Sequence, residues 1–259
     1  MLPPGTLLQL MYLQDRLKQL SPGRFIEIGP GSGETTNLLL KLGWTGYAFD
    51  LEAKTIQALG ERFHDAEIAR RLVPIHANFL TSPPPEKVDL VISCMVMEHM
   101  EDEQELAFMH QAARCLNQNG LMIGLVPASP AHWGIEDDIA GHYRRYTREA
   151  LKGLMQKSDW KLTHTAGLTF PVSNLLFPIS NYLVRRAEKY KLTLSHLEKT
   201  KLSGRRQVKF KTHFPSLAGI LLNKPVLTPL HWLQKKCSKS EHALVIYFEA
   251  KINFPVDRL

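Results

Sequence analysis

Three glycines at alternate positions separate a short apolar stretch from a run rich in threonine and leucine. They are Gly29, Gly31 and Gly33, with Glu27 shortly before them and Glu34 directly after. A glycine turn between a strand and a helix lets a ligand approach the backbone and the N-terminal amides of the helix. Two cofactor classes use this geometry, the dinucleotides and S-adenosylmethionine.

The acidic neighbours of the turn distinguish between these two classes. A dinucleotide needs its third glycine where this sequence has Glu34, and a carboxylate there would repel the two phosphates by about 1 kcal/mol or more. S-adenosylmethionine carries an ammonium and a sulfonium group, whose positive charge Glu27 can compensate directly or by orienting the turn. Asp50 stands where an acid accepts both ribose hydroxyls, a feature that both cofactor classes share.

The chain around the turn alternates between short apolar stretches and amphipathic ones. This alternation predicts a doubly wound α/β sheet, mostly parallel, with right-handed connections. A turn is expected at 117–120, and Thr147 is expected to cap the helix that follows it. We predict strands at 24–28, 47–50, 72–76, 88–93, 121–126, 160–165 and 243–250, and helices at 7–20, 35–42, 53–63, 103–116 and 147–158.

A long stretch separates the last two strands. It contains FPVSNLLFPISNYLVRRAEKY, which we expect to be helical but broken at Pro171 and Pro178, followed by the basic segment LSGRRQVKFK. Such a stretch suggests an inserted lid or subdomain. We therefore expect an N-terminal helix at 1–22, a Rossmann-like cofactor-binding core at 23–166, a basic helical insertion at 167–240, and the last core strand and tail at 241–259.

The net charge of +7 is unevenly distributed along the 259 residues. Residues 1–150 contain 13 basic and 19 acidic side chains, whereas residues 151–259 contain 19 and 6. The second part would therefore attract an anionic partner, either nucleic acid, a phosphorylated substrate or a lipid headgroup layer. A basic face that is merely solvated stays open as the alternative.

Composition points to an ordinary globular protein of a reducing compartment. Hydrophobic residues make up 44% and charged residues 22% of the chain. The three cysteines, Cys94, Cys115 and Cys237, form no C-x-x-C pair, so neither a disulfide framework nor a zinc site is expected. The start of the chain shows no basic leader, and no run reaches the roughly 18 apolar residues of a membrane span. We expect a cytoplasmic protein.

Five segments, in order, resemble the motif set of class I S-adenosylmethionine-dependent methyltransferases. They are EIGPGSGETT, GYAFDLE, HANFL, VDLVISCMVMEHMED and LNQNGLMIGLVP. The resemblance implies a seven-stranded sheet with an antiparallel last strand, and S-adenosylmethionine as cofactor. Asn78 stands where the family more often has Asp. The cofactor-binding residues that we expect are Glu27, Gly29, Gly31, Gly33, Asp50, Leu51, Asn78, Phe79, Cys94 and Glu98.

Two histidines are candidates for the general base. Glu98 and His99 resemble the Glu-His pair that follows the fourth strand in many family members, where the histidine contacts substrate or acts as a base. His142, after the fifth strand, is the second candidate, because imidazole exchanges protons readily near neutral pH. A packing or capping role for His99 stays open. Related ubiquinone-pathway enzymes use a further Glu to bind a metal, but Met95 stands there, so no metal is expected.

The segment 131–147 after the fifth strand is polar but carries several aromatic residues. This mixture suits recognition of a polar substrate, with arginine holding a carboxylate or phosphate in its planar fork. Pairing of the arginines with the acids just upstream is the alternative. The candidate substrate-binding residues are Trp133, Tyr143, Arg144, Arg145 and Tyr146.

These features predict a methyltransferase that acts on a small or carrier-linked polar acceptor, at oxygen. A looser resemblance to enzymes of glycan and lipid-linked sugar pathways, with the basic apolar stretch at 217–239, suggests peripheral contact with an anionic membrane surface. An RNA methyltransferase, an oxidoreductase and a binding protein without activity are the alternatives. The sequence after the fourth strand, SCMV, lacks the N/D-P-P-Y/F tetrapeptide of many base-methylating enzymes, which disfavours nucleic acid as a partner.

Overall fold

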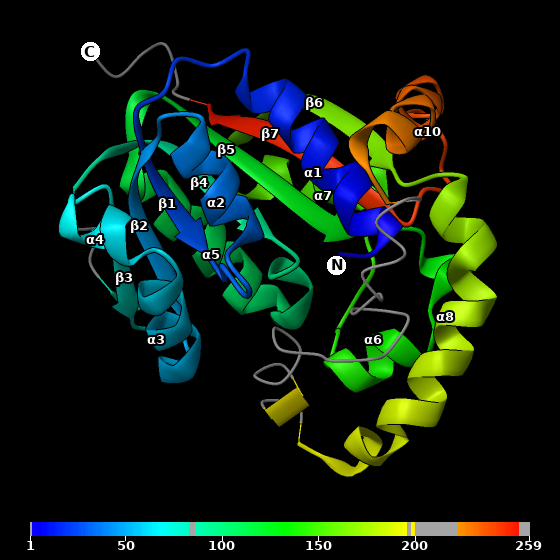
Figure 1. Cartoon of the computed structure of the whole chain (residues 1–259). Coiled ribbons are helices and arrows are strands. Elements are labelled where there is room, and N and C mark those ends of the chain that lie inside the picture. Colours follow the sequence, from blue (N-terminus) through cyan, green and yellow to red (C-terminus); the bar gives the residue numbers. More distant parts are fainter. Residues whose placement is uncertain (1, 83–85, 196–197, 200–221, 254–259) are drawn as a thin grey trace. The chain divides into compact units, whose positions relative to one another are not determined.

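The computed structural model describes residues 2–82, 86–195, 198–199 and 222–253 (Figure 1). Its central feature is a seven-stranded sheet in the order β3-β2-β1-β4-β5-β7-β6. The predicted α/β sheet, mostly parallel with an antiparallel last pair, is confirmed. The strands are β1 (Arg24–Ile28), β2 (Thr45–Asp50), β3 (Leu72–His76), β4 (Val88–Cys94), β5 (Leu116–Pro127), β6 (Trp160–Leu168) and β7 (Val245–Ile252).

The strand order reverses between β1 and β4, which pair with each other in parallel. From β1 the chain winds outward through β2 to β3, and then returns to add β4 and β5 on the other side. In open α/β sheets, ligands bind outside the carboxyl ends of the strands at such a reversal. The topology therefore places the candidate site beyond Ile28 and Cys94.

The residues form two compact units, and three of the divisions between them fall within β5, β6 and β7. The sheet unit comprises Ser21–Val126, Thr147–Thr165 and Tyr247–Leu259. The helical unit comprises Met1–Leu20, Pro127–Tyr146 and Ala166–Ile246.

In the sheet unit, helices cover strands whose side chains are buried on both faces. Four apolar residues of β4, Val88, Leu90, Val91 and Ile92, are fully buried, as expected of a central parallel strand. Helix α3 packs on β2 and β3, and α5 packs on β4. The helices are α2 (Glu34–Lys41), α3 (Ala53–Arg62), α4 (His64–Ile68), α5 (Asp102–Cys115) and α7 (Arg148–Lys157), with the 3-10 turn η1 (Met97–His99).

In the helical unit, a buried amide joins the ends of the sequence. The Gln234 side chain donates to the carbonyl of Leu8 at 2.9 Å and accepts from the Thr169 amide at 2.9 Å. Lys235 and His231 both contact Asp15 on the first helix. The elements are α1 (Pro4–Leu17), α6 (Ile135–Ala140), α8 (Val172–Glu188) and α10 (Lys224–Lys236), with the 3-10 helices η2 (Pro130–His132) and η3 (Lys189–Thr193).

Two local predictions were wrong. The expected turn at 117–120 lies inside β5: two steps along β4, from Val88 to Leu90, correspond to five along β5, so the extra residues are taken up by an irregularity within the ladder. The expected break at Pro178 is absent, because α8 continues through it. Pro178 is exposed, and it removes one amide donor from the hydrogen bonds of the helix.

Other local predictions hold, and some fall outside the described residues. Thr147 caps α7 by accepting from the Ala150 amide at 3.1 Å, as predicted. Helix α6 was not predicted, because its six residues are too few to show a periodic pattern.

The basic segment 202–211 and most of 217–222 lie outside the described residues. Within the described ranges, no helix has both the length and the apolar character needed to cross a bilayer.

Gly124 of β5 offers a test of the packing between neighbouring strands. A Cβ at this position would lie 2.2 Å from the ring of buried Phe248 on β7. Gly124→Ala should therefore lower the free energy of unfolding by roughly 2 kcal/mol, the usual cost of overpacking. Chemical denaturation of the variant measures this loss.

Two further variants control for the effect of the added methyl. Gly153→Ala adds the same group in α7 with no atom within 4 Å, and should stabilise the protein by up to about 1 kcal/mol. Phe248→Leu in the Gly124→Ala background should recover part of the loss. Equal effects of the two glycine substitutions would contradict the packing described here.

Candidate active site

The turn after β1 is held in a backbone conformation that requires glycine. Gly29, Gly31 and Gly33 all have φ between 53° and 81°, in the left-handed region. A Cβ on Gly29 would lie 2.5 Å from Val96 after β4, and one on Gly33 would lie 2.8 Å from Leu59 of α3. The turn therefore lies directly against the segment that follows β4, at the reversal of the sheet, and presents backbone rather than side chains.

Glu27 is buried beneath this turn. The Thr36 hydroxyl donates to Glu27 Oε2 at 2.5 Å, and both side chains are almost fully inaccessible. Burial raises the pKa of Glu27 to about 7, and the hydrogen bond from Thr36 opposes this only in part. A cationic ligand near the turn would favour the ionised carboxylate, so Glu27 is suited to respond to positive charge.

Glu34 carries a charge that the sequence alone left uncompensated, but in the structure it has a cationic partner. Its carboxylate lies 2.8 Å from Arg62 Nη1, and the same guanidinium donates to the Ser32 carbonyl. This ion pair offsets part of the charge that would repel a diphosphate. The exclusion of dinucleotides from Glu34 alone is therefore weaker than the sequence suggested.

The acid at the end of β2 is oriented by the local backbone. Asp50 Oδ1 accepts from the Glu52 amide at 2.8 Å, which fixes the carboxylate at the carboxyl edge of the sheet. Leu51 beside it is exposed, which is unusual for leucine so close to the core. This pairing of an acid with an exposed apolar side chain suits a ribose and its attached base.

Asn78 and Phe79, after β3, have different surroundings. The Asn78 side-chain oxygen accepts from the Leu80 amide at 3.0 Å, so this amide is used to shape the turn. Phe79 is buried between the rings of Phe49 and Phe108. In the structure, Phe79 is therefore a core residue, whereas Asn78 lies nearer the surface.

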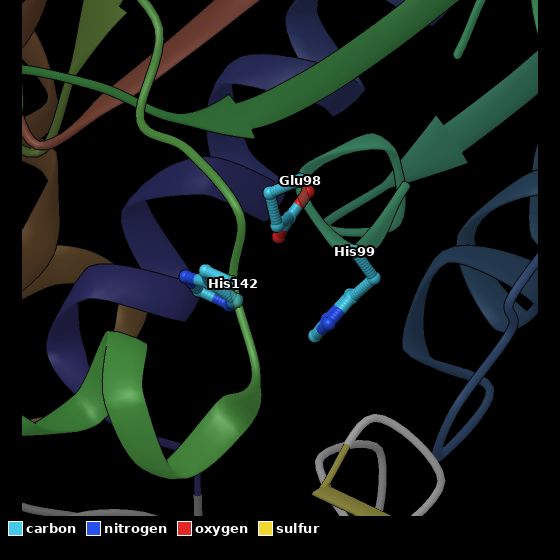
Figure 2. Close-up of side chains that lie close together, drawn as sticks. All are labelled: Glu98, His99 and His142. Atoms are coloured by element: carbon cyan, nitrogen blue, oxygen red, sulfur yellow. The ribbon is translucent and has the colours of Figure 1, made fainter. Parts of the chain in front are cut away.

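The end of β4 combines buried polar groups with a strained backbone. Cys94 accepts a hydrogen bond from Thr35 at 3.8 Å, and burial raises the pKa of its thiol to about 12, so the thiol stays protonated. Met95 has φ of 57°, rare for a side chain of this size and often found at functional sites. Figure 2 shows Glu98 and His99 projecting from η1; Glu98 is fully buried and His99 partly exposed.

In the helical unit, buried Asp137 organises the segment that follows β5. One carboxylate oxygen accepts from Arg145 Nε at 2.9 Å and lies 2.8 Å from His142 Nδ1, and the other accepts from the Gly134 amide at 2.8 Å. Burial opposes ionisation, but the bond from His142 and the charge of Arg145 together hold the pKa of Asp137 below its usual value. His142, labelled in Figure 2, thus has a fixed ring orientation.

Asp137 also explains the role of Arg145. The guanidinium of Arg145 is almost fully buried, donates to the Ala128 carbonyl at 3.0 Å and lies over the ring of Phe177. Arg145 therefore pairs with an upstream acid, which was the alternative to substrate binding. The signal was present in the sequence as Asp137 followed five and eight residues later by His142 and Arg145, but a loop has no period from which to infer their contact.

The remaining candidates for substrate contact differ in their exposure. Trp133 and Tyr143 are exposed, with the Trp133 indole donating to Asp138 at 2.9 Å. Arg144 is partly exposed. Tyr146 is buried, and its backbone bridges to Ala128 at the end of β5. Trp133, Tyr143 and Arg144 therefore remain accessible to a ligand, whereas Tyr146 contributes to the core.

Comparison with known proteins bears on this arrangement. Residues 8–165 match the family described as Methyltransferase domain, well over half of the chain. The chain belongs to this methyltransferase family. A curated relative, an uncharacterized methyltransferase of Bacillus subtilis (strain 168) named YrrT, is 27% identical over 107 residues. That match covers 41% of this chain and 48% of YrrT, so the methyltransferase chain matches about half the length of this relative.

Solved structures share the methyltransferase fold at low identity. The glycopeptide N-methyltransferase MtfA is 10% identical with a TM-score of 0.56, covering 95% of this chain and 90% of its own. The 1,6-didemethyltoxoflavin-N1-methyltransferase of Burkholderia thailandensis, solved with S-adenosylhomocysteine, is 16% identical with a TM-score of 0.52 and coverages of 64% and 73%. Magnesium protoporphyrin IX methyltransferase from Synechocystis PCC 6803, with the same ligand, is 14% identical with a TM-score of 0.53 and coverages of 64% and 77%.

The raised pKa of Glu27 predicts a pH-dependent stability for the methyltransferase. The folded protein holds a proton on Glu27 up to about pH 7, whereas the unfolded chain loses it near 4.5, so folding takes up a proton in this window. Stability should therefore fall as pH rises from about 4.5 to above 7, by roughly 3 kcal/mol. Glu27→Gln should remove this part of the slope, as measured by chemical denaturation at several pH values.

Glu61→Gln is the matched control for this measurement. Glu61 is an exposed acid on α3 that accepts a hydrogen bond from Gln57, so its neutralisation should leave the pH slope unchanged. A Glu27→Gln variant whose stability changes with pH in parallel with the parent would show that Glu27 is ionised in the folded protein throughout the window.

The Asp137 cluster predicts a large loss of stability on neutralisation. Asp137→Asn leaves the buried Arg145 without its counter-ion and should cost about 3 kcal/mol or more. Asp138→Asn, one residue further on and exposed, should change stability by less than about 0.5 kcal/mol. Thermal and chemical denaturation of both variants provide the measurement.

A double substitution separates the ion pair from other effects of Asp137. Arg145→Met should cost less stability in the Asp137→Asn background than in the parent protein, because the charge that it removes is then already unpaired. Strict additivity of the two single losses would contradict the ion pair.

Proposed function

We propose that this chain is an S-adenosylmethionine-dependent methyltransferase that methylates a small or carrier-linked polar acceptor at oxygen. Membership of the methyltransferase family supports the reaction class. The observation that carries the cofactor assignment is the turn of left-handed glycines at the sheet reversal, with a buried acid beneath it. Such a turn leaves room for an uncharged backbone contact, and Glu27 favours a ligand that brings positive charge.

The residues that would hold the cofactor lie at the carboxyl edge of the sheet. The turn of Gly29, Gly31 and Gly33 would contact the methionine part, and Asp50 would accept the ribose hydroxyls, with Leu51 beside them. Asn78 is proposed to border the adenine. Further proposed contributors are Cys94, which is partly exposed, and Glu27, Phe79 and Glu98, whose buried positions suit support of the site more than direct contact.

In the proposed reaction, a residue of the chain removes the proton of the acceptor, and the cofactor supplies an already activated methyl group. When bound, S-adenosylmethionine supplies a methyl group on a sulfonium, already activated for in-line displacement. A hydroxyl acceptor must lose its proton during transfer, which calls for a base. His142 fits this role, because Asp137 holds its Nδ1 and directs Nε2 to accept the proton. His99 remains the second candidate.

The acceptor would meet an aromatic and basic surface of the helical unit. Trp133 and Tyr143 are exposed rings that can stack on a sugar or another planar polar group. Arg144 is the remaining candidate to hold a carboxylate or phosphate, since Arg145 is committed to Asp137. We propose the cytoplasm as the compartment, which the free thiols of all three cysteines support.

Calorimetric titration with S-adenosylmethionine tests the cofactor assignment. The parent protein should bind, and Asp50→Ala should weaken the affinity by roughly 10- to 100-fold, the loss expected for hydrogen bonds to a charged group. Asp65→Ala removes an exposed acid from α4 and should bind like the parent.

Three other outcomes would redirect the assignment. Binding of NADH with no binding of S-adenosylmethionine would identify an oxidoreductase. Strongly salt-dependent binding of RNA would favour an RNA methyltransferase. Cofactor binding without formation of S-adenosylhomocysteine, across a panel of hydroxyl, carboxyl and amine acceptors, would indicate a binding protein without activity.

A further inference from the structure

Helix α8 presents a stripe of apolar side chains to solvent. Leu175, Ile179 and Tyr182 follow one another at spacings of four and three, and so lie on one side of the helix. Their exposed fractions are 75%, 59% and 63%. A helix at the surface of a globular domain ordinarily turns such a stripe towards the core, whereas this stripe of α8 faces outward.

The opposite side of α8 makes polar contacts within the helical unit. Asn174 donates to the His242 carbonyl at 2.8 Å, and Ser180 donates to Glu136 of α6 at 3.0 Å. The Asn181 amide lies against Gly134, where a Cβ would be 2.7 Å away. Rotating α8 to bury its apolar stripe would break these bonds and expose Val184, which is fully buried. The orientation is therefore fixed by the fold.

The last turn of α8 and the residues just after it add positive charge. Arg185, Arg186 and Lys189 are exposed, and Arg186 continues the line of Leu175, Ile179 and Tyr182 along the helix. Glu188 is the acid of α8, but it is buried and paired with Lys191 of η3. The exposed charge at this end is thus cationic, next to an apolar stripe that carries a tyrosine.

These properties favour an anionic lipid bilayer over a second copy of the chain as the covering partner. Arginine and lysine next to exposed aliphatic side chains match anionic headgroups above acyl chains, and tyrosine is enriched at that interface. A second copy would bring the same cations and no exposed acid of α8 to pair with them. Charge complementarity therefore selects the lipid surface.

We propose that α8 is a membrane-docking helix that lies on an anionic bilayer through Leu175, Ile179 and Tyr182, with Arg185 and Arg186 at the headgroups. This site differs from the basic stretch at 217–239 that the sequence suggested. It does not depend on the proposed catalysis, because none of these side chains belongs to the candidate active site.

Sedimentation with vesicles tests the proposal on the full chain. The protein should bind vesicles of phosphatidylcholine mixed with phosphatidylglycerol and not those of phosphatidylcholine alone. Leu175→Ser with Ile179→Ser should weaken binding by roughly tenfold or more through lost apolar burial. Arg185→Gln and Arg186→Gln should each weaken it by roughly fivefold, and added salt should reproduce that loss.

Matched variants elsewhere separate docking from general stickiness. Ile68→Ser removes an equally exposed isoleucine from α4, and Lys152→Gln with Lys157→Gln removes two exposed cations from α7. Both should bind vesicles like the parent. Unchanged binding of the α8 variants would overturn the proposal. So would a dimer, detected by light scattering, that Leu175→Ser with Ile179→Ser converts to monomer while no vesicle binding is seen.

Calorimetry with S-adenosylmethionine distinguishes failure of this proposal from failure of the proposed function. The α8 variants should bind the cofactor like the parent, which also verifies that they fold. A protein that binds vesicles but not S-adenosylmethionine would leave the docking helix standing and overturn the assignment as a methyltransferase.

Discussion

The backbone of the turn between β1 and α2 is the constraint on which the sheet unit depends. Left-handed glycines allow the chain to leave the central strand and start a helix within a few residues, while Val96 and Leu59 close in on positions where a side chain would collide. The same absence of side chains creates the space in which a ligand can contact the backbone. Folding and binding thus impose the same requirement on the same residues, where the strand order reverses between β1 and β4.

Two buried carboxylates illustrate how surroundings determine chemistry. Glu27 is buried against the hydroxyl of Thr36, and its pKa rises to about 7. Asp137 is equally buried, but an arginine and a histidine share it, and its pKa is lowered. The first is therefore poised to ionise when positive charge arrives, whereas the second is a permanent anion that holds a histidine ring in place. Burial alone would have shifted both pKa values in the same direction.

Several polar contacts organise the helical unit. Gln234 joins α10 to α1, Asp137 joins α6 to the segment after it, and the serine and asparagine side chains of α8 bond inward. Because polar groups occupy much of the inner side of α8, Leu175 and Ile179 are left outside. An outward stripe of this kind costs apolar burial within the chain, which an external apolar partner can restore.

The sequence by itself determined the alternating architecture, the glycine turn and the methyltransferase family, because short-range patterns carry all three. Period, composition and ordered motifs need no knowledge of distant contacts. Thr147 as a cap and β3 at 72–76 were likewise local and were predicted correctly. Even the wrong turn at 117–120 reflects a real irregularity, since those residues lie where β5 departs from the register of β4.

Only the tertiary structure decided the fate of the polar residues, because it depends on partners far away in the sequence. Arg145 is a structural cation through Asp137, and Glu34 is offset by Arg62 from another helix. Phe79 joins Phe49 and Phe108 in the core rather than standing free. The direction in which α8 faces is set by His242 and Glu136, neither of which belongs to the helix. Charge and hydrogen bonding act through space, and a linear pattern does not contain those distances.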